Sequence, residues 1–162
     1  MNYRHLIPVL IFTIVALFQI TLLPWAAINK AIPQLTVIVL VLYTHVNGQL
    51  YGTVSGFVFG IIFDLLSGGL LGLGMFSYTA AGFMAGYFHN ENKIAFYDEP
   101  HFFILSVFIS SLVYSLLYSL ASLGDISYNF WILLIEYSLL PAAYTTGVAL
   151  ILPVFRKVKN FR

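Results

Sequence analysis

Six long apolar runs, separated by short polar segments, occupy almost the whole chain. The hydrocarbon core of a bilayer is about 30 Å thick, so an α-helix crosses it with about 20 mainly apolar residues. The pattern therefore predicts an all-α integral membrane protein, built as a compact bundle of about six transmembrane helices. The predicted spans are residues 6–23, 32–46, 50–66, 71–88, 102–123 and 128–155.

Three of these runs differ from the length of an ordinary transmembrane helix or contain a proline. The first exceeds the apolar region of about 7–15 residues in a signal peptide, so we interpret residues 6–23 as a retained helix. Residues 32–46 are few for a full crossing, and this helix must recruit flanking residues or lie where the bilayer is thin. The last run is long and contains Pro141, which predicts a kinked helix.

The connections between the runs are short and contain no flexible linker or low-complexity tract. We therefore expect residues 1–162 to form a single membrane domain. The longest polar segment, His89–His101, has ligand-type side chains without a metal-binding spacing. We interpret it as a solvated loop rather than a metal site.

Composition supports the membrane interpretation and excludes several functions. The chain is 60% hydrophobic and 8% charged, with a mean hydropathy of +0.94, which leaves too little polar surface for a water-soluble globule. A formal net charge of +1 gives no support to a nucleic-acid partner. Because there is no Cys, disulfides, thiolate metal sites, iron–sulfur clusters and a cysteine nucleophile are excluded.

The distribution of basic residues predicts the orientation. If both termini face the cytoplasm, that side collects all the Lys and Arg residues except Lys30, in agreement with the positive-inside rule. We therefore expect a multi-pass protein with both termini in the cytoplasm. The basic C-terminal tail, residues 155–162, would then lie against the anionic lipid of the inner leaflet.

Small residues recur at a helical spacing in the third run. Glycines occupy every fourth position, and the same step continues to Asp64 and Gly68; these glycines are Gly48, Gly52, Gly56 and Gly60. Close backbone contact through small residues is a main way to hold helices together in lipid. We favour packing within one protomer, with docking of a partner, or of a second copy in a homodimer, as the alternatives.

Asp64 lies inside this apolar run, and a carboxylate there is costly unless it is paired, hydrogen-bonded or hydrated. Two interpretations are open. Ser67 and the backbone N–H groups of Gly68 and Gly69 could cap the carboxylate in a turn. Alternatively, the carboxylate faces a partner.

Glu136, shortly before Pro141, is the other acid within an apolar run, and it is a candidate for pairing across the bundle or for partner contact. The chain has no phosphate-cradling glycine-rich loop, no strained serine turn and no acidic array for magnesium. We therefore expect neither an enzyme nor a cofactor.

The segment YGTVSGFVFGIIFDLLSGGLLGLGMFSYTAAGFMAGY, Tyr51–Tyr87, resembles the central signature of the MreD family of rod shape-determining membrane proteins. The matching motif comprises Gly56, Gly60, Asp64, Leu65, Leu66, Ser67, Gly68, Leu71 and Gly72. Chain length, Pro33, Glu136, Pro141 and the basic tail are also similar. The chain departs from the family at Gln34, where an acid is common.

This resemblance implies a non-enzymatic scaffold of the bacterial elongation complex in the cytoplasmic (inner) membrane. It implies that the protein binds MreC and works with the RodA glycosyltransferase, its penicillin-binding transpeptidase and the actin-like MreB. In this role the protein would link MreB filaments to peptidoglycan synthesis.

The family also looks like the six-helix substrate-binding subunits of energy-coupling-factor transporters, which makes a vitamin transporter subunit the alternative. That function needs a polar pocket on the outer side, for which Trp25, Asp64, Asp125 and Tyr128 are the candidates. A small intramembrane enzyme is the third possibility.

Overall fold

The structure is a computed structural model that describes residues 6–27, 31–89, 100–123, 131 and 134–159. These residues form six long helices, a short 3₁₀ helix and one turn of π-helix, which confirms the all-α prediction. The elements are α1 (Leu6–Thr21), η2 (Leu23–Ala26), α2 (Leu35–Asn47), α3 (Gln49–Ser67), α4 (Leu73–Gly86), α6 (Pro100–Leu123), η3 (Ile135–Leu139) and α8 (Leu140–Lys159). Asp125 and Tyr128 lie outside the described residues.

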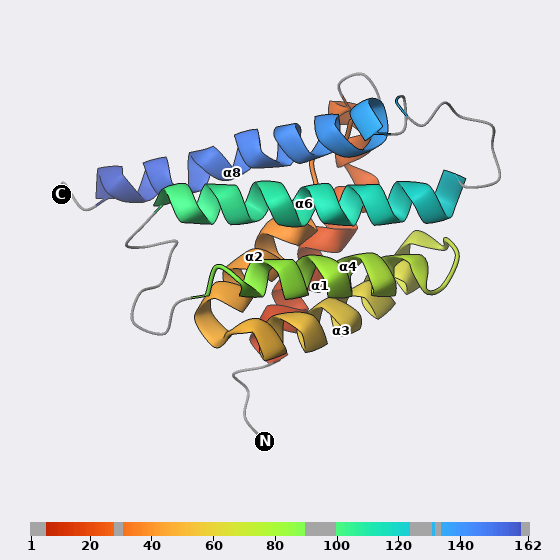
Figure 1. Ribbon diagram of the computed structural model, residues 1–162, viewed down its shortest axis with the longest axis horizontal. Helices are drawn as coiled ribbons and strands as arrows, with labels where there is room; N and C mark the ends of the chain where they lie inside the picture. The colour runs from red at the N-terminus through yellow and green to blue at the C-terminus, as the bar shows by residue number, and fades with distance from the viewer. Residues whose placement is uncertain (1–5, 28–30, 90–99, 124–130, 132–133, 160–162) are drawn as a thin grey trace.

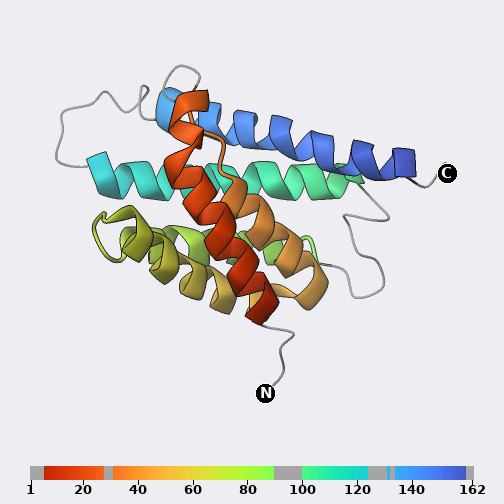
Figure 2. The same ribbon diagram turned by 180° about the vertical axis from the view of Figure 1, so that it is seen from behind.

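The helices pack as antiparallel pairs (Figure 1). Helices α6 and α8 lie side by side, and α3 and α4 form a hairpin that packs on α6 through α4. Helices α1 and α2 cross the back of the bundle at an angle to both pairs (Figure 2). The hairpin of α3 and α4 has the most extensive helix–helix contact among the described residues.

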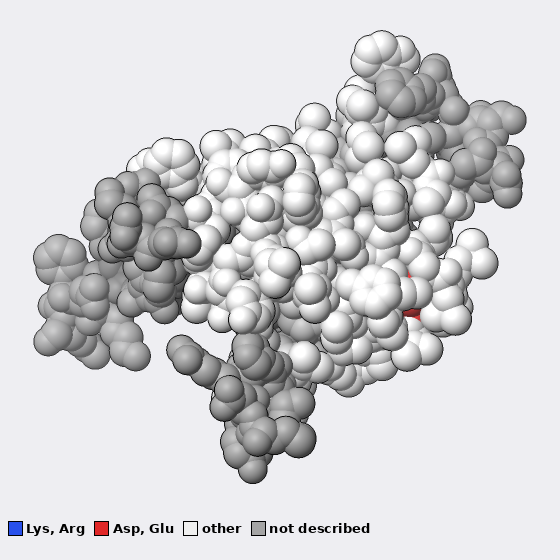
Figure 3. Space-filling view, turned by 60° about the horizontal axis from the view of Figure 1, so that its bottom comes forward, with Lys and Arg blue, Asp and Glu red and all other residues white. Residues whose placement is uncertain are grey.

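The outer surface has the character of a lipid-facing surface. Large apolar side chains are exposed on several helices, including Leu10, Ile14, Val54 and Phe76. On the face shown in Figure 3, the described residues are almost entirely uncharged. Among the described residues, Gln49–Ser67 and Pro100–Ser122 are long and apolar enough to cross a membrane, while α1 and α2 are shorter apolar helices.

The core is aromatic and centres on Tyr78 of α4, which is fully buried. Its ring meets Phe12 of α1 edge-on, with centroids 5.6 Å apart, and lies 4.4 Å from the ring centroid of Tyr114 of α6. Phe12 in turn stacks on Phe59 of α3 at 4.1 Å. A single cluster of rings therefore joins α1, α3, α4 and α6.

A chain of buried hydrogen bonds crosses the same region. The Gln19 Oε1 atom accepts hydrogen bonds from the Thr36 backbone N–H at 3.1 Å and from its hydroxyl at 3.0 Å. The Thr36 hydroxyl lies 2.6 Å from the Tyr78 hydroxyl. Because the single Thr36 proton goes to Gln19, the Tyr78 hydroxyl is the donor in the second contact. The chain therefore ties α1, α2 and α4 together where no water competes.

We expect Tyr78→Phe to lower the free energy of unfolding by about 1–2 kcal/mol, because it removes the buried hydrogen bonds of the Tyr78 hydroxyl with Thr36 and Tyr114 while keeping the ring. The measurement is unfolding in detergent, followed by circular dichroism. Tyr87→Phe is the control, because the Tyr87 side chain is 67% exposed and this change should have no effect. Equal stability of the two variants would contradict a stabilising role for the buried chain.

Candidate functional site

The glycines of α3 lie against the backbone of α4. A Cβ atom built at Gly56 would collide with the carbonyl group of Tyr78, and one built at Gly60 would collide with the backbone of Met75. A Cβ atom at Gly52 would meet the Thr44 side chain and the Gly82 carbonyl oxygen. Any larger side chain at these three positions would separate the two helices.

Helix α4 contributes small residues to the same interface. A Cβ atom at Gly82 would collide with the carbonyl group of Gly52, and one at Gly86 would collide with Gln49. The contact surface of Gly52, Gly56 and Gly60 is therefore filled by α4 of the same chain. Gly48 lies apart from this interface, between α2 and α3, at a φ of +97° with the His89 ring 3.5 Å from the position of its Cβ atom.

Two glycines with positive φ shape the turn from α3 to α4. Gly68, at a φ of +65°, ends α3 in the left-handed conformation, and Gly72, at a φ of +111°, precedes the first residue of α4. A Cβ atom would meet nothing within 4 Å at either position, so the backbone conformation rather than space explains the choice of glycine.

The Asp64 carboxylate closes this turn. It is 2% exposed and accepts hydrogen bonds from three backbone N–H groups at the start of α4. Its Oδ2 atom accepts from Gly72 at 2.9 Å and from Met75 at 3.3 Å, and its Oδ1 atom accepts from Gly74 at 2.9 Å. The carboxylate thus acts as the cap that the first turn of α4 lacks from its own residues.

This geometry explains why a carboxylate is tolerated here. The first N–H groups of a helix have no partner inside the helix and carry the positive end of its dipole, so a negative charge is stabilised there. The capping donors are Gly72, Gly74 and Met75, in place of the Gly68 and Gly69 groups expected from the sequence. Ser67 instead donates to the backbone carbonyl of Asp64 at 3.3 Å.

Glu136 lies in a turn of π-helix directly before Pro141. The Leu140 N–H bonds to the carbonyl of Ile135, five residues earlier, and α8 then continues through the buried Pro141. Proline has no N–H and its ring crowds the preceding turn, so the wider turn accommodates it. Glu136 is half-buried, far along the chain from the Asp64 turn, and its role in partner contact stays a prediction.

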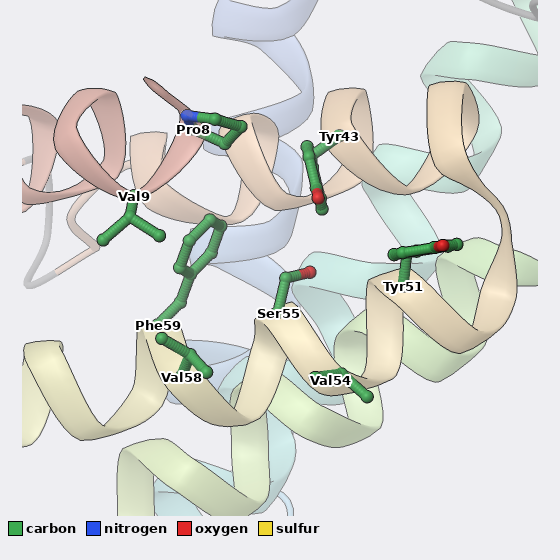
Figure 4. Close-up of a pocket in the computed structure, with 8 residues that line it drawn as sticks. All are labelled: Pro8, Val9, Tyr43, Tyr51, Val54, Ser55, Val58 and Phe59. Carbon is green, nitrogen blue, oxygen red and sulfur yellow. The ribbon is translucent and has the colours of Figure 1, made fainter. Parts of the chain in front are cut away.

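A groove on the outer surface lies where α1 crosses α2 and α3 (Figure 4). Its volume is about 260 Å³, and its lining is almost wholly apolar apart from Ser55 and the hydroxyl groups of Tyr43 and Tyr51. Its other lining residues are Pro8, Val9, Val54, Val58 and Phe59.

The sequence did not reveal the polar groups inside the bundle or the donors to Asp64. Gln19 and Thr36 each interrupt an apolar run, and such interruptions are the signal for an internal hydrogen bond. The signal for the cap was the Gly72-Leu73-Gly74 segment, which places two residues without side chains at the start of the helix after Asp64.

A helical bundle that exposes apolar side chains and satisfies its acid internally has the architecture of an integral membrane protein. The family model described as rod shape-determining protein MreD matches residues 1–157, and the chain belongs to the MreD family. This confirms the resemblance seen in the sequence. No curated protein and no solved structure matches the chain. The family comprises structural proteins of the bacterial inner membrane that determine rod shape.

We expect Gly56→Ala to destabilise the protein by about 2 kcal/mol, because the new methyl group forces α3 away from the Tyr78 carbonyl. Gly147→Ala in α8 is the matched control. A Cβ atom there meets nothing within 4 Å, and the gain in helix propensity should stabilise the protein by up to about 1 kcal/mol. Unfolding in detergent measures both changes, and a loss of similar size in the two variants would contradict the interface.

We expect Asp64→Asn to expose the start of α4, because the amide keeps one acceptor oxygen for three donors and loses the charge. The cost is about 1–3 kcal/mol. Hydrogen–deuterium exchange should accelerate at Gly72, Gly74 and Met75 while α6 stays protected. Ser67→Ala, which removes only a 3.3 Å bond at an exposed residue, is the control. Unchanged exchange in Asp64→Asn would disprove the capping role.

Proposed function

We propose that this protein is a non-enzymatic scaffold of the bacterial elongation complex. It binds the transmembrane helix of MreC and works with the RodA glycosyltransferase and its penicillin-binding transpeptidase. In this role it links MreB filaments in the cytoplasm to peptidoglycan synthesis outside. The observation that carries the proposal is the family match over residues 1–157.

The rigid interior supports a positioning role. A scaffold needs a surface of fixed shape, and the direct backbone contact of α3 with α4 leaves little freedom for the hairpin. It needs no cluster of reactive groups. Among the described residues, no group of three or more His, Cys, Asp or Glu side chains is placed to hold a metal ion.

The partner surface that we propose is the groove where α1 crosses α2 and α3. Helix α4 covers the surface of α3 at its glycines, so a partner helix must contact an outward-facing surface. The groove is apolar enough for a transmembrane helix, and the small Ser55 allows a close approach beside Val54 and Val58. The Asp64 carboxylate supports this surface indirectly, because it fixes the hairpin to which α3 belongs.

The proposed orientation places both termini in the cytoplasm and the Asp64 turn at the outer end of the bundle. The positive-inside bias of the sequence supports it. In this orientation, a partner helix held in the groove would carry its attached outer domain at a fixed distance from the membrane.

The test is to extract the tagged protein gently from native membranes and identify the co-purifying proteins by mass spectrometry. We expect MreC, with RodA or the transpeptidase. Recovery of a pair of ATPases with a transmembrane coupling protein would instead establish the vitamin-transporter function and overturn the scaffold. Recovery of neither set from membranes that contain the elongation proteins would also overturn it.

A matched pair of variants tests the groove. Val54→Trp fills it, whereas Leu105→Trp makes the same kind of change on the exposed surface of α6. We expect the first to reduce recovery of MreC severalfold and the second to leave it unchanged, with both proteins folded. An equal effect of the two variants would place the MreC contact elsewhere.

A further inference from the structure

A second cavity opens at the end of the bundle near the Asp64 turn. Its volume is about 270 Å³, and it lies where α1, η2, the segment before α2, α3, α6 and α8 meet. The apolar part of its wall consists of Ile20, Pro24, Ile32, Phe63 and Pro141. The polar part consists of Gln19, Gln34, Tyr114 and Tyr118. A concave, mostly apolar site with a few polar groups is the usual form of a small-molecule site.

The orientation of the Gln19 amide is fixed by its neighbour. A backbone N–H can only donate, so the atom of Gln19 that faces the Thr36 backbone must be the oxygen. That oxygen also accepts from the Thr36 hydroxyl. Among the described residues, none accepts a hydrogen bond from the NH₂ group of Gln19. Gln19 is also one of the residues that line the cavity. Gln19 therefore supplies donors to the cavity.

The Gln34 amide is fixed in the opposite sense. The single hydroxyl proton of Ser115 goes to the Ser111 carbonyl at 2.7 Å, which leaves the Ser115 oxygen as an acceptor. The Gln34 NH₂ group donates to that oxygen at 3.0 Å. The Gln34 Oε1 atom is 3.4 Å from the same hydroxyl, whose proton is already used, so it remains an acceptor for the cavity.

The rest of the wall selects for a neutral and planar molecule. None of the described residues that line the cavity is charged. The nearby Asp64 carboxylate already accepts hydrogen bonds from three backbone N–H groups at the start of α4. The Tyr118 ring stacks on the Tyr114 ring, with centroids 5.6 Å apart and planes 18° apart, and the Tyr114 ring centroid lies 4.4 Å from that of Tyr78. Tyr114 is therefore enclosed between two rings, and Tyr118 supplies the aromatic part of the cavity wall.

We propose that this cavity binds a small, neutral, planar molecule with an amide or lactam edge. The carbonyl oxygen of that edge accepts from the NH₂ group of Gln19, its N–H donates to the Gln34 Oε1 atom, and its ring lies against Tyr118. This binding is independent of the scaffold function, because the cavity and the groove of Figure 4 have no lining residue in common within the described part of the chain.

Benzamide and benzoate are the probes that test the proposal. They have the same ring and nearly the same size, but benzoate is an anion without a donor. Saturation-transfer NMR on the full-length protein in nanodiscs should show saturable binding of benzamide at least about tenfold tighter than that of benzoate, a difference of about 1.4 kcal/mol. Equal binding of the two probes, or no saturable binding of benzamide, would overturn the proposal.

Variants assign the binding to the two amides. Gln19→Glu keeps an acceptor for Thr36 but removes the donors, and we expect it to weaken benzamide binding about tenfold or more. Gln49→Glu makes the same chemical change in α3, outside the cavity, and should leave binding unchanged. If Gln19→Glu does not fold, Gln34→Met decides, because it removes the acceptor and keeps the Gln34 backbone bond to Thr145. Full binding in a folded variant of either residue would disprove the site.

Discussion

The rest of the structure depends on the direct contact between the backbones of α3 and α4. Gly52, Gly56 and Gly60 let the two helices approach until carbonyl groups occupy the space of side chains, and the Asp64 carboxylate then closes the hairpin at its turn. In lipid, where apolar side chains gain little by leaving the solvent, such close packing and internal hydrogen bonds hold helices together. Helices α2 and α6 then pack on a hairpin whose shape is already fixed.

Several buried polar groups of the bundle form hydrogen bonds with one another or with the backbone. Gln19, Thr36 and Tyr78 each bring a polar group into the core, and together they form one chain that joins three helices. The acid at the hairpin turn is satisfied by backbone donors. The outer surface consists of apolar side chains and includes the apolar groove beside α1, while the cavity near the turn is mostly apolar with two amide side chains in its wall.

The sequence predicted those features that repeat with a helical period. Apolar runs predicted the helices, and the four-residue spacing of Gly52, Gly56 and Gly60 predicted a face for close packing, because both depend on local geometry. The donors to Asp64 could not be predicted in the same way, since Gly72 and Gly74 reach the carboxylate only through the path of the turn. The pairing of Gln19 with Thr36 depends on how α1 crosses α2, which no local pattern specifies.

The turn of π-helix at Ile135–Leu139 changes how the last apolar run should be read. A π-turn places one extra residue in a helical turn, and each residue of an α-helix advances by about 100° around the axis. A stripe drawn at a constant period through residues 134–151 therefore joins positions that face different sides of the bundle. Leu134 and Ala149, for example, lie on opposite sides of the π-turn and belong to two separate registers, so comparisons of related chains must align the segments before and after it independently.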